Sequence, residues 1–192
     1  MVNAISSQPY TLPLQSVAPK AYHAYHANVQ NEENTGNGIF GGFSTDFTSI
    51  SSMASHAAGG GVAAYKFGLQ MNDNMRSVFG NGFKGALGGI KNTALTGLKG
   101  AGLSALVSVG VSAVANGIGV ATGKVERADV AHHVINDGIG GAVGGLVGVT
   151  AAGLASFIPV KGVMGTVLTV GAGAVGSVLG SQMVGEFNWY RG

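Results

Sequence analysis

Three uncharged stretches follow one another in the second half of the sequence, and they limit the possible folds of this chain more than any other feature. They run from Gly100 to Gly123, from Gly138 to Val160 and from Gly162 to Gly185, and each contains 23 or 24 residues. An α-helix needs about 20 residues to cross the roughly 30 Å hydrocarbon core of a bilayer. The sequence therefore predicts an all-α fold with about three membrane-spanning helices.

The segments between these stretches have the composition of helix ends. Lys124–Asp137 carries five charged residues, and the turn that follows the second stretch contains Pro159, Lys161 and Gly162. Proline ends a helix, and glycine allows the chain to reverse. The second and third stretches are therefore predicted to form a tight helical hairpin.

The composition argues against an ordinary soluble domain. Only 9% of the residues are charged and 35 of 192 are Gly, whereas a typical domain has roughly 25% charged residues and about 7% Gly. Leu, Ile, Val and Phe each favour insertion by only about 0.3–0.6 kcal/mol, and Gly, Ser and Thr do not add to it. Insertion free energies this small suit a chain that a partner holds in soluble form before it inserts into the membrane.

Small residues recur at every fourth position within the uncharged stretches. Residues four apart lie on one face of a helix, so such rows form grooves in which two backbones can approach closely. Each Gly costs a helix up to about 1 kcal/mol in water relative to Ala, which implies a packing reason for these rows. The predicted helix-packing residues of these glycine zippers are Gly140, Gly144, Gly148, Gly165, Gly173, Gly176 and Gly180. A tightly packed soluble bundle or a viral structural protein is the alternative interpretation.

A basic helix is predicted before the first uncharged stretch. Lys84, Lys91 and Lys99 have spacings of seven and eight residues, which places them on one helical face, opposite Leu87, Ile90 and Leu98. Amphipathic helices of this kind lie at membrane surfaces, where lysines meet anionic head groups. The three lysines are therefore predicted to lie at the membrane interface, and the alternative is a solvated helix face.

The chain divides into four predicted regions. Residues 1–45 hold three of the four prolines and read as an extended or disordered arm. Residues 46–80 are weakly helical, with a helix near 60–79, residues 81–99 form the basic helix, and residues 100–192 form the membrane helices. Trp189 and Tyr190 follow the last stretch and are predicted to lie at the membrane interface, which these side chains favour.

Enzymatic chemistry is not expected. The chain has no Cys, and it lacks a nucleophile elbow, a phosphate-binding loop and a His-Glu-x-x-His zinc motif. We therefore predict no catalytic residues, no metal and no cofactor. The net charge of +2 without a basic cluster gives no support for nucleic-acid binding. His133 and Asp137 are four residues apart and could form a charged pair or a pH-sensitive hinge, or belong to a solvated linker.

The segment from Gly138 to Ser181 resembles a known class of proteins. Its glycine rows and its turn at residues 158–162, followed by Gly165, Thr166 and Val167, are similar to the glycine-zipper segments of pore-forming bacterial effectors and of some phage DNA-delivery proteins. A less extensive resemblance, to the mitochondrial preprotein translocase channel family, rests on Arg127, Asp129, Val130, Gly140, Gly141 and Gly145. Both resemblances imply work done in a membrane.

The first functional hypothesis is a bacterial effector or toxin that inserts into a lipid bilayer and forms a homo-oligomeric pore. Small polar faces suit a pore wall, and the predicted pore-lining residues are Ser104, Ser108, Ser112 and Asn116. Residues 1–20 lack the features of a signal peptide, so a delivery machinery, a chaperone and an immunity protein are the expected partners. The second hypothesis is a virion structural or ejection protein that contacts other virion subunits or enters the host membrane.

Overall fold

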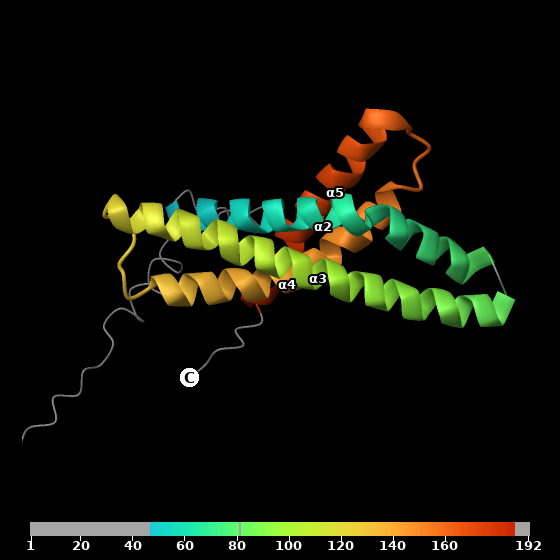
Figure 1. The fold of residues 1–192 in the computed structure, drawn as a ribbon, viewed down its shortest axis with the longest axis horizontal. Helices are drawn as coiled ribbons and strands as arrows, with labels where there is room; N and C mark the ends of the chain where they lie inside the picture. Colours follow the sequence, from blue (N-terminus) through green and yellow to red (C-terminus); the bar gives the residue numbers. More distant parts are fainter. Residues whose placement is uncertain (1–46, 81, 187–192) are drawn as a thin grey trace, which may run out of the picture. The chain divides into compact units, whose positions relative to one another are not determined.

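The described part of the chain is entirely helical. The computed structural model describes residues 47–80 and 82–186, which form α2 (Phe47–Gly80), α3 (Gly82–Ala121), α4 (Val130–Ala155) and α5 (Gly162–Glu186) (Figure 1). No strand occurs within these two ranges, so the predicted all-α class is confirmed. The predicted arm at residues 1–45 and the predicted interface residues Trp189 and Tyr190 lie outside the described residues.

Helices α2 and α4 form the centre of the bundle. Both contact α3, both contact α5, and they contact each other, whereas α3 and α5 share no contact within the described residues. Helices α3 and α5 therefore lie on opposite sides of the α2–α4 pair, and α5 crosses the other helices obliquely (Figure 1). The sequence singles out α2 as the weakest helix, yet it is one of the two that touch all the others.

Glycines with positive φ end or begin the helices at the turns. Helix α3 ends in a Schellman motif, in which Lys124 N–H donates to Gly119 O at 2.8 Å and Gly123, at φ 71°, donates to Val120 O at 3.2 Å. Gly162 has φ 69° and begins α5 directly after the turn that contains Pro159. This is the reversal that the sequence predicts between the second and third stretches.

The helix boundaries differ from the sequence expectation in three places. The basic helix and the first uncharged stretch are one continuous helix, α3, without a break between residues 99 and 100. Helix α4 begins at Val130, so His133 and Asp137 belong to a helix and not to a linker. Helix α2 covers residues 47–80 and not only 60–79. Patterns of hydropathy place these boundaries poorly because small residues are neither clearly apolar nor clearly polar.

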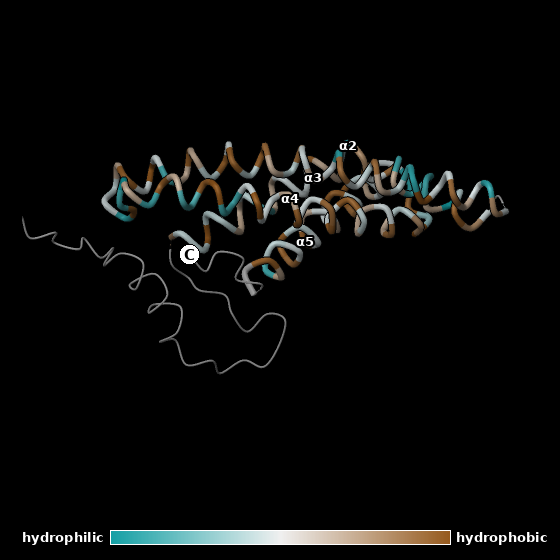
Figure 2. Tube along the Cα trace, turned by 90° about the horizontal axis from the view of Figure 1, so that it is seen from below, coloured by the Kyte–Doolittle hydropathy of each residue, from teal (hydrophilic) through white to brown (hydrophobic). Residues whose placement is uncertain are grey.

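Helix α3 is longer than a membrane crossing requires. Its 40 residues extend about 60 Å at 1.5 Å per residue, roughly twice the hydrocarbon thickness. The hairpin of α2 and α3 extends beyond the α4–α5 turn (Figure 1). Hydrophilic residues concentrate along this hairpin and at the α3–α4 turn, while apolar residues run along all four helices (Figure 2).

Candidate functional site: a polar interior inside an apolar exterior

The distribution of side chains is the reverse of that in a soluble protein. Among the described residues no Leu, Ile or Phe side chain is buried, and the buried apolar residues are Ala63, Ala64, Met71, Val125, Val149 and Ala152. The buried polar residues are more numerous: Ser55, His56, Asn72, Thr96, Ser104, Ser108, Ser112, Asn116, Asp137, Thr169, Ser177 and Ser181. Soluble domains bury large apolar side chains and keep most polar ones outside. This bundle has a small, polar interior.

The exterior is correspondingly apolar. Leu106 is 73% exposed, Val163 81% and Phe83 81%, and large apolar side chains are exposed on every helix. Three helices, Gly82–Ala121, Val130–Ala155 and the Gly162–Val184 part of α5, are long and apolar enough to cross a membrane. Small residues at helix contacts and large apolar ones outside are the arrangement that lipid favours. The fold is consistent with a location in a membrane.

The glycine rows of α4 and α5 lie at the contact between these helices. A Cβ on Gly144 would lie 2.4 Å from Ser177 O, and one on Gly148 would lie 2.5 Å from Gly173 O. Gly176 and Gly180 face α4 in the same way, opposite Ala151 and Val147 respectively. Since real Cβ atoms do not approach other atoms this closely, only Gly allows this separation of the two backbones.

Three of the predicted packing glycines have other neighbours. Gly173 faces α2, with 2.1 Å between a built Cβ and the Ala64 Cβ. Gly140 faces the imidazole of His56 on α2, with 2.7 Å between a built Cβ and Nε2. The space beside Gly165 is filled by Val160 O of the preceding turn, so this glycine contacts its own hairpin and not another helix.

The predicted pore-lining residues are buried between three helices. Ser104, Ser108 and Ser112 are fully buried and Asn116 nearly so. Ser104 and Ser108 face Gly59 of α2 on one side and Gly141 and Gly145 of α4 on the other, and Ser108 Oγ donates to Ser55 O at 3.1 Å. In this arrangement they are packing residues. Contact with a water-filled lumen would require α2 to move away from α3 and α4.

A fourth row of inward residues, on α2, is absent from the sequence-based prediction. It recurs at every fourth position through Ser52, His56, Gly60, Ala64, Gly68 and Asn72, and Arg76 continues the spacing at an exposed position. The five residues from His56 to Asn72 are buried. The four-residue spacing was the available signal, but His, Asn and Arg interrupt the series of small residues.

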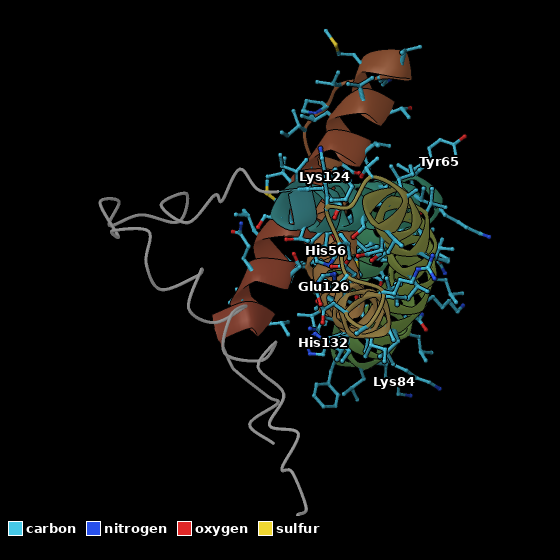
Figure 3. The ribbon with its side chains drawn as sticks, turned by 90° about the vertical axis from the view of Figure 1, so that its left-hand side faces the viewer. His56, Tyr65, Lys84, Lys124, Glu126 and His132 are labelled. Carbon is cyan, nitrogen blue, oxygen red and sulfur yellow. The ribbon has the colours of Figure 1, made fainter. Side chains whose placement is uncertain are left out.

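A polar cluster joins this α2 row to α4. His56 Nε2 donates to the main-chain oxygen of Asp137 at 3.2 Å, because a carbonyl can only accept. The same nitrogen lies 3.7 Å from Asp137 Oδ1, and Ser52 Oγ donates to that carboxylate oxygen at 2.5 Å. The view along the helices shows His56 among them, whereas Tyr65 and Lys84 lie at the outside (Figure 3).

The electrostatics of His56 follow from this geometry. Burial lowers the pKa of His56 below its ordinary value of 6.5, and the opposing effects of the Asp137 charge and of the Asp137 backbone bond do not offset the burial. The sequence suggested that Asp137 could pair with His133. The structure gives Asp137 the α2 partners His56 and Ser52, and brings His133 Nδ1 to 2.9 Å from Asn116 Oδ1 of α3.

Polar contacts also hold the opposite end of α2. Asn72 Nδ2 donates to Gly153 O of α4 at 3.0 Å, and Arg76 Nε donates to Asn72 Oδ1 at 2.8 Å. The Arg76 guanidinium lies 5.0 Å from the centroid of the Phe157 ring, a cation–π distance. Helix α2 is thus attached to α4 by polar groups near both ends and by small residues between them.

The three predicted interface lysines are exposed. Lys84, Lys91 and Lys99 lie on the outer side of α3, whose buried side in this segment consists of Gly89, Thr96, Gly97 and Gly100. Leu87, Ile90 and Leu98 are also exposed, at 55%, 57% and 65%, so they do not pack into the bundle. Both the charged and the apolar side chains of this segment are available to a membrane surface. Their placement at an interface stays a prediction.

Comparison with known proteins gives no match, whether to a family model, to a curated protein or to a solved structure.

Proposed function

We propose that this protein inserts into a lipid bilayer as a helix bundle and makes the membrane permeable to ions, as a pore-forming effector does. The observation that carries the proposal is the reversed side-chain distribution, with large apolar residues outside and Gly, Ser, Asn and His inside. Lipid solvates the first group, and a hydrated lumen suits the second. We infer that α3, α4 and α5 cross the bilayer, because these three helices have the required length and hydropathy.

The role of α2 distinguishes a closed form from a conducting one. It is the one described helix outside the set of candidate spans, and it covers the serine row of α3 through Gly59. Departure of α2 would leave Ser104, Ser108, Ser112 and Asn116 facing a groove. Grooves of several copies, joined around an axis, would enclose a lumen lined by hydroxyl and amide groups. A homo-oligomer is therefore part of the proposal.

The first prediction tests the close contact between α4 and α5 on which the bundle depends. A Leu side chain at Gly144 would collide with Ser177 O, which lies 2.4 Å from a built Cβ. Overpacking of this kind costs about 1–3 kcal/mol or more, equivalent to about five- to hundredfold or more in the population of the packed bundle. We expect Gly144→Leu to reduce ion flux from liposomes by at least about fivefold.

The matched control is Val143→Leu, since Val143 is the neighbouring residue and is 37% exposed on the outer side of α4. This variant should conduct like the parent. Equal flux from both variants would contradict the packing argument. Membranes washed with alkali provide the broader test: a chain that is released by alkali and gives no flux would favour the virion hypothesis, and co-purification with coat or tail proteins would then be expected.

A further inference from the structure

The cluster of Ser52, His56 and Asp137 is a buried titratable site between α2 and α4. Asp137 is 6% and His56 7% exposed, and the two residues join α2 to α4 across 81 positions of sequence. Ionisable groups buried in such helices are expensive to keep, and they commonly serve proton or ion chemistry. The close backbone contacts elsewhere in this bundle are made by Gly, Ala and Ser.

We propose that Ser52, His56 and Asp137 form a proton-operated latch that holds α2 against α4 near neutral pH and releases α2 on acidification. The ligand of the site is a proton, and its acceptor is Nδ1 of His56, because Nε2 already carries the hydrogen that it donates to Asp137 O. Protonation converts the neutral ring to an imidazolium inside the bundle.

The surroundings of His56 compensate that charge only in part. Its Nε2 bonds to a neutral carbonyl, and the nearest carboxylate oxygen lies within ion-pair distance at 3.7 Å but also accepts from Ser52. The Asp137 charge opposes the effect of burial without offsetting it. On the other elements at this level, Ser108 of α3 faces Gly141 and Ser181 of α5 faces Gly140, and neither carries a charge. His133, one turn before Asp137, contacts Asn116. The Gly140 backbone lies against the ring, and a built Cβ there would be 2.7 Å from Nε2.

The sign of the pH effect follows from these contacts. In the released state His56 is hydrated and binds a proton near its ordinary pKa of 6.5, whereas burial lowers the pKa in the docked state. The released state therefore binds more protons below that value, so docking is fully favoured above about pH 6.5 and weakens as the pH falls below it. Each unit of difference in pKa between the two states changes the docking equilibrium about tenfold.

The absence of Cys from the chain allows a single-thiol measurement of docking. Ala63→Cys places a reporter at a fully buried position of α2, and Ala54→Cys places one at an exposed position. The rate of reaction with a water-soluble maleimide is measured on the full chain in detergent at about pH 7.5 and about pH 5. At each pH, the rate for Ala63→Cys is divided by the rate for Ala54→Cys, which removes the intrinsic effect of pH on thiols. We expect this ratio to rise on acidification, because burial lowers the pKa of His56 in the docked state.

Three substitutions, each combined with the cysteine reporters, show which residue causes the change with pH. His56→Gln keeps a donor for Asp137 O but does not titrate, so the ratio should stay low at both pH values. His132→Gln, on an exposed histidine of α4, should leave the rise intact. Asp137→Asn should also leave it intact, because His56 is the proton acceptor, and this variant decides the matter if the His56→Gln protein does not fold.

A ratio that does not change with pH in the parent background would overturn the latch, as would a rise that persists in His56→Gln or disappears in Asp137→Asn. The function of α2 release rests on the proposed pore, but the measurement needs neither a bilayer nor conductance. A failed latch therefore leaves the pore proposal standing, and a missing ion flux leaves the latch standing.

Discussion

Single hydroxyl groups differ in what they contribute to this interior. Ser108 Oγ donates to Ser55 O of the neighbouring helix, whereas Ser104 Oγ and Ser177 Oγ are buried without a hydrogen-bond partner in the described part of the chain. A buried hydroxyl without a partner destabilises a protein, and a bonded one stabilises it by about 0.5–1.5 kcal/mol. Three serines of similar burial should therefore respond differently to the same substitution.

We predict that Ser108→Ala lowers the free energy of unfolding by about 0.5–1.5 kcal/mol, while Ser104→Ala and Ser177→Ala leave it unchanged or raise it. Thermal unfolding in detergent, followed by circular dichroism, measures all three variants against the parent. Equal losses in the three variants would show that Ser104 and Ser177 have hydrogen-bond partners, such as water, in solution. The predicted difference between the hydrogen-bonded and the unbonded serines would then be wrong.

At the scale of helices, α2 depends on two alanines. Ala63 and Ala64 are fully buried, and a Cβ on Gly173 of α5 would lie 2.1 Å from the Ala64 Cβ. A larger side chain at position 64 therefore pushes α2 away from α5. Val62 is 44% exposed on the other side of the same helix, and it tolerates a larger apolar group.

We predict that Ala64→Leu destabilises the docking of α2 by about 1–3 kcal/mol, whereas Val62→Leu changes it by less than about 0.5 kcal/mol. Trypsin provides the measurement, because Lys66 lies in α2 and a protease cuts a helix only after local opening. Cleavage after Lys66 should accelerate in the first variant and not in the second. Equal cleavage rates in the two variants would contradict the argument that contact with α5 holds α2 in place.

The sequence predicted the helical class from its three long uncharged stretches, and it predicted the α4–α5 hairpin from the turn that contains Pro159 and Gly162. Both are local signals. The inward faces of α3, α4 and α5 were also visible, since four-residue spacing alone defines a helix face. Helix α2 was underestimated because its row includes His56 and Asn72, which read as polar surface. Their partners, Asp137 and Gly153, are 81 positions away, and no local pattern predicts which helices meet.

At the scale of the whole molecule, the two described turns that flank α4 make a topology test possible. Glu126 in the α3–α4 turn and Lys161 in the α4–α5 turn are both exposed, and α4 contains 26 residues, or about 39 Å of helix. A helix of that length crosses the hydrocarbon core and places its ends in water on opposite sides.

We predict that Glu126→Cys and Lys161→Cys react with an impermeant thiol reagent from opposite sides of a sealed vesicle. The parent chain has no Cys, so each variant carries a single reporting thiol. Lys84, Lys91, Lys99 and Lys161 outnumber Lys124, Arg127 and Arg191, which favours the Lys161 turn on the cytoplasmic side when the chain inserts from within. Labelling of both variants from one side would exclude α4 as a membrane crossing.

The reversed interior of this bundle also determines how its sequence can diverge. In a soluble protein the large apolar residues of the core resist replacement and the surface drifts. Here the outward Leu, Ile, Val and Phe residues would meet lipid chains in the proposed membrane location and could replace one another freely there, whereas an added methyl group at Gly60, Gly144 or Gly173 meets another backbone or side chain within 3 Å. Descendants of this sequence should therefore keep a fixed pattern of the smallest residues, four positions apart, while nearly all of the hydrophobic residues change around it.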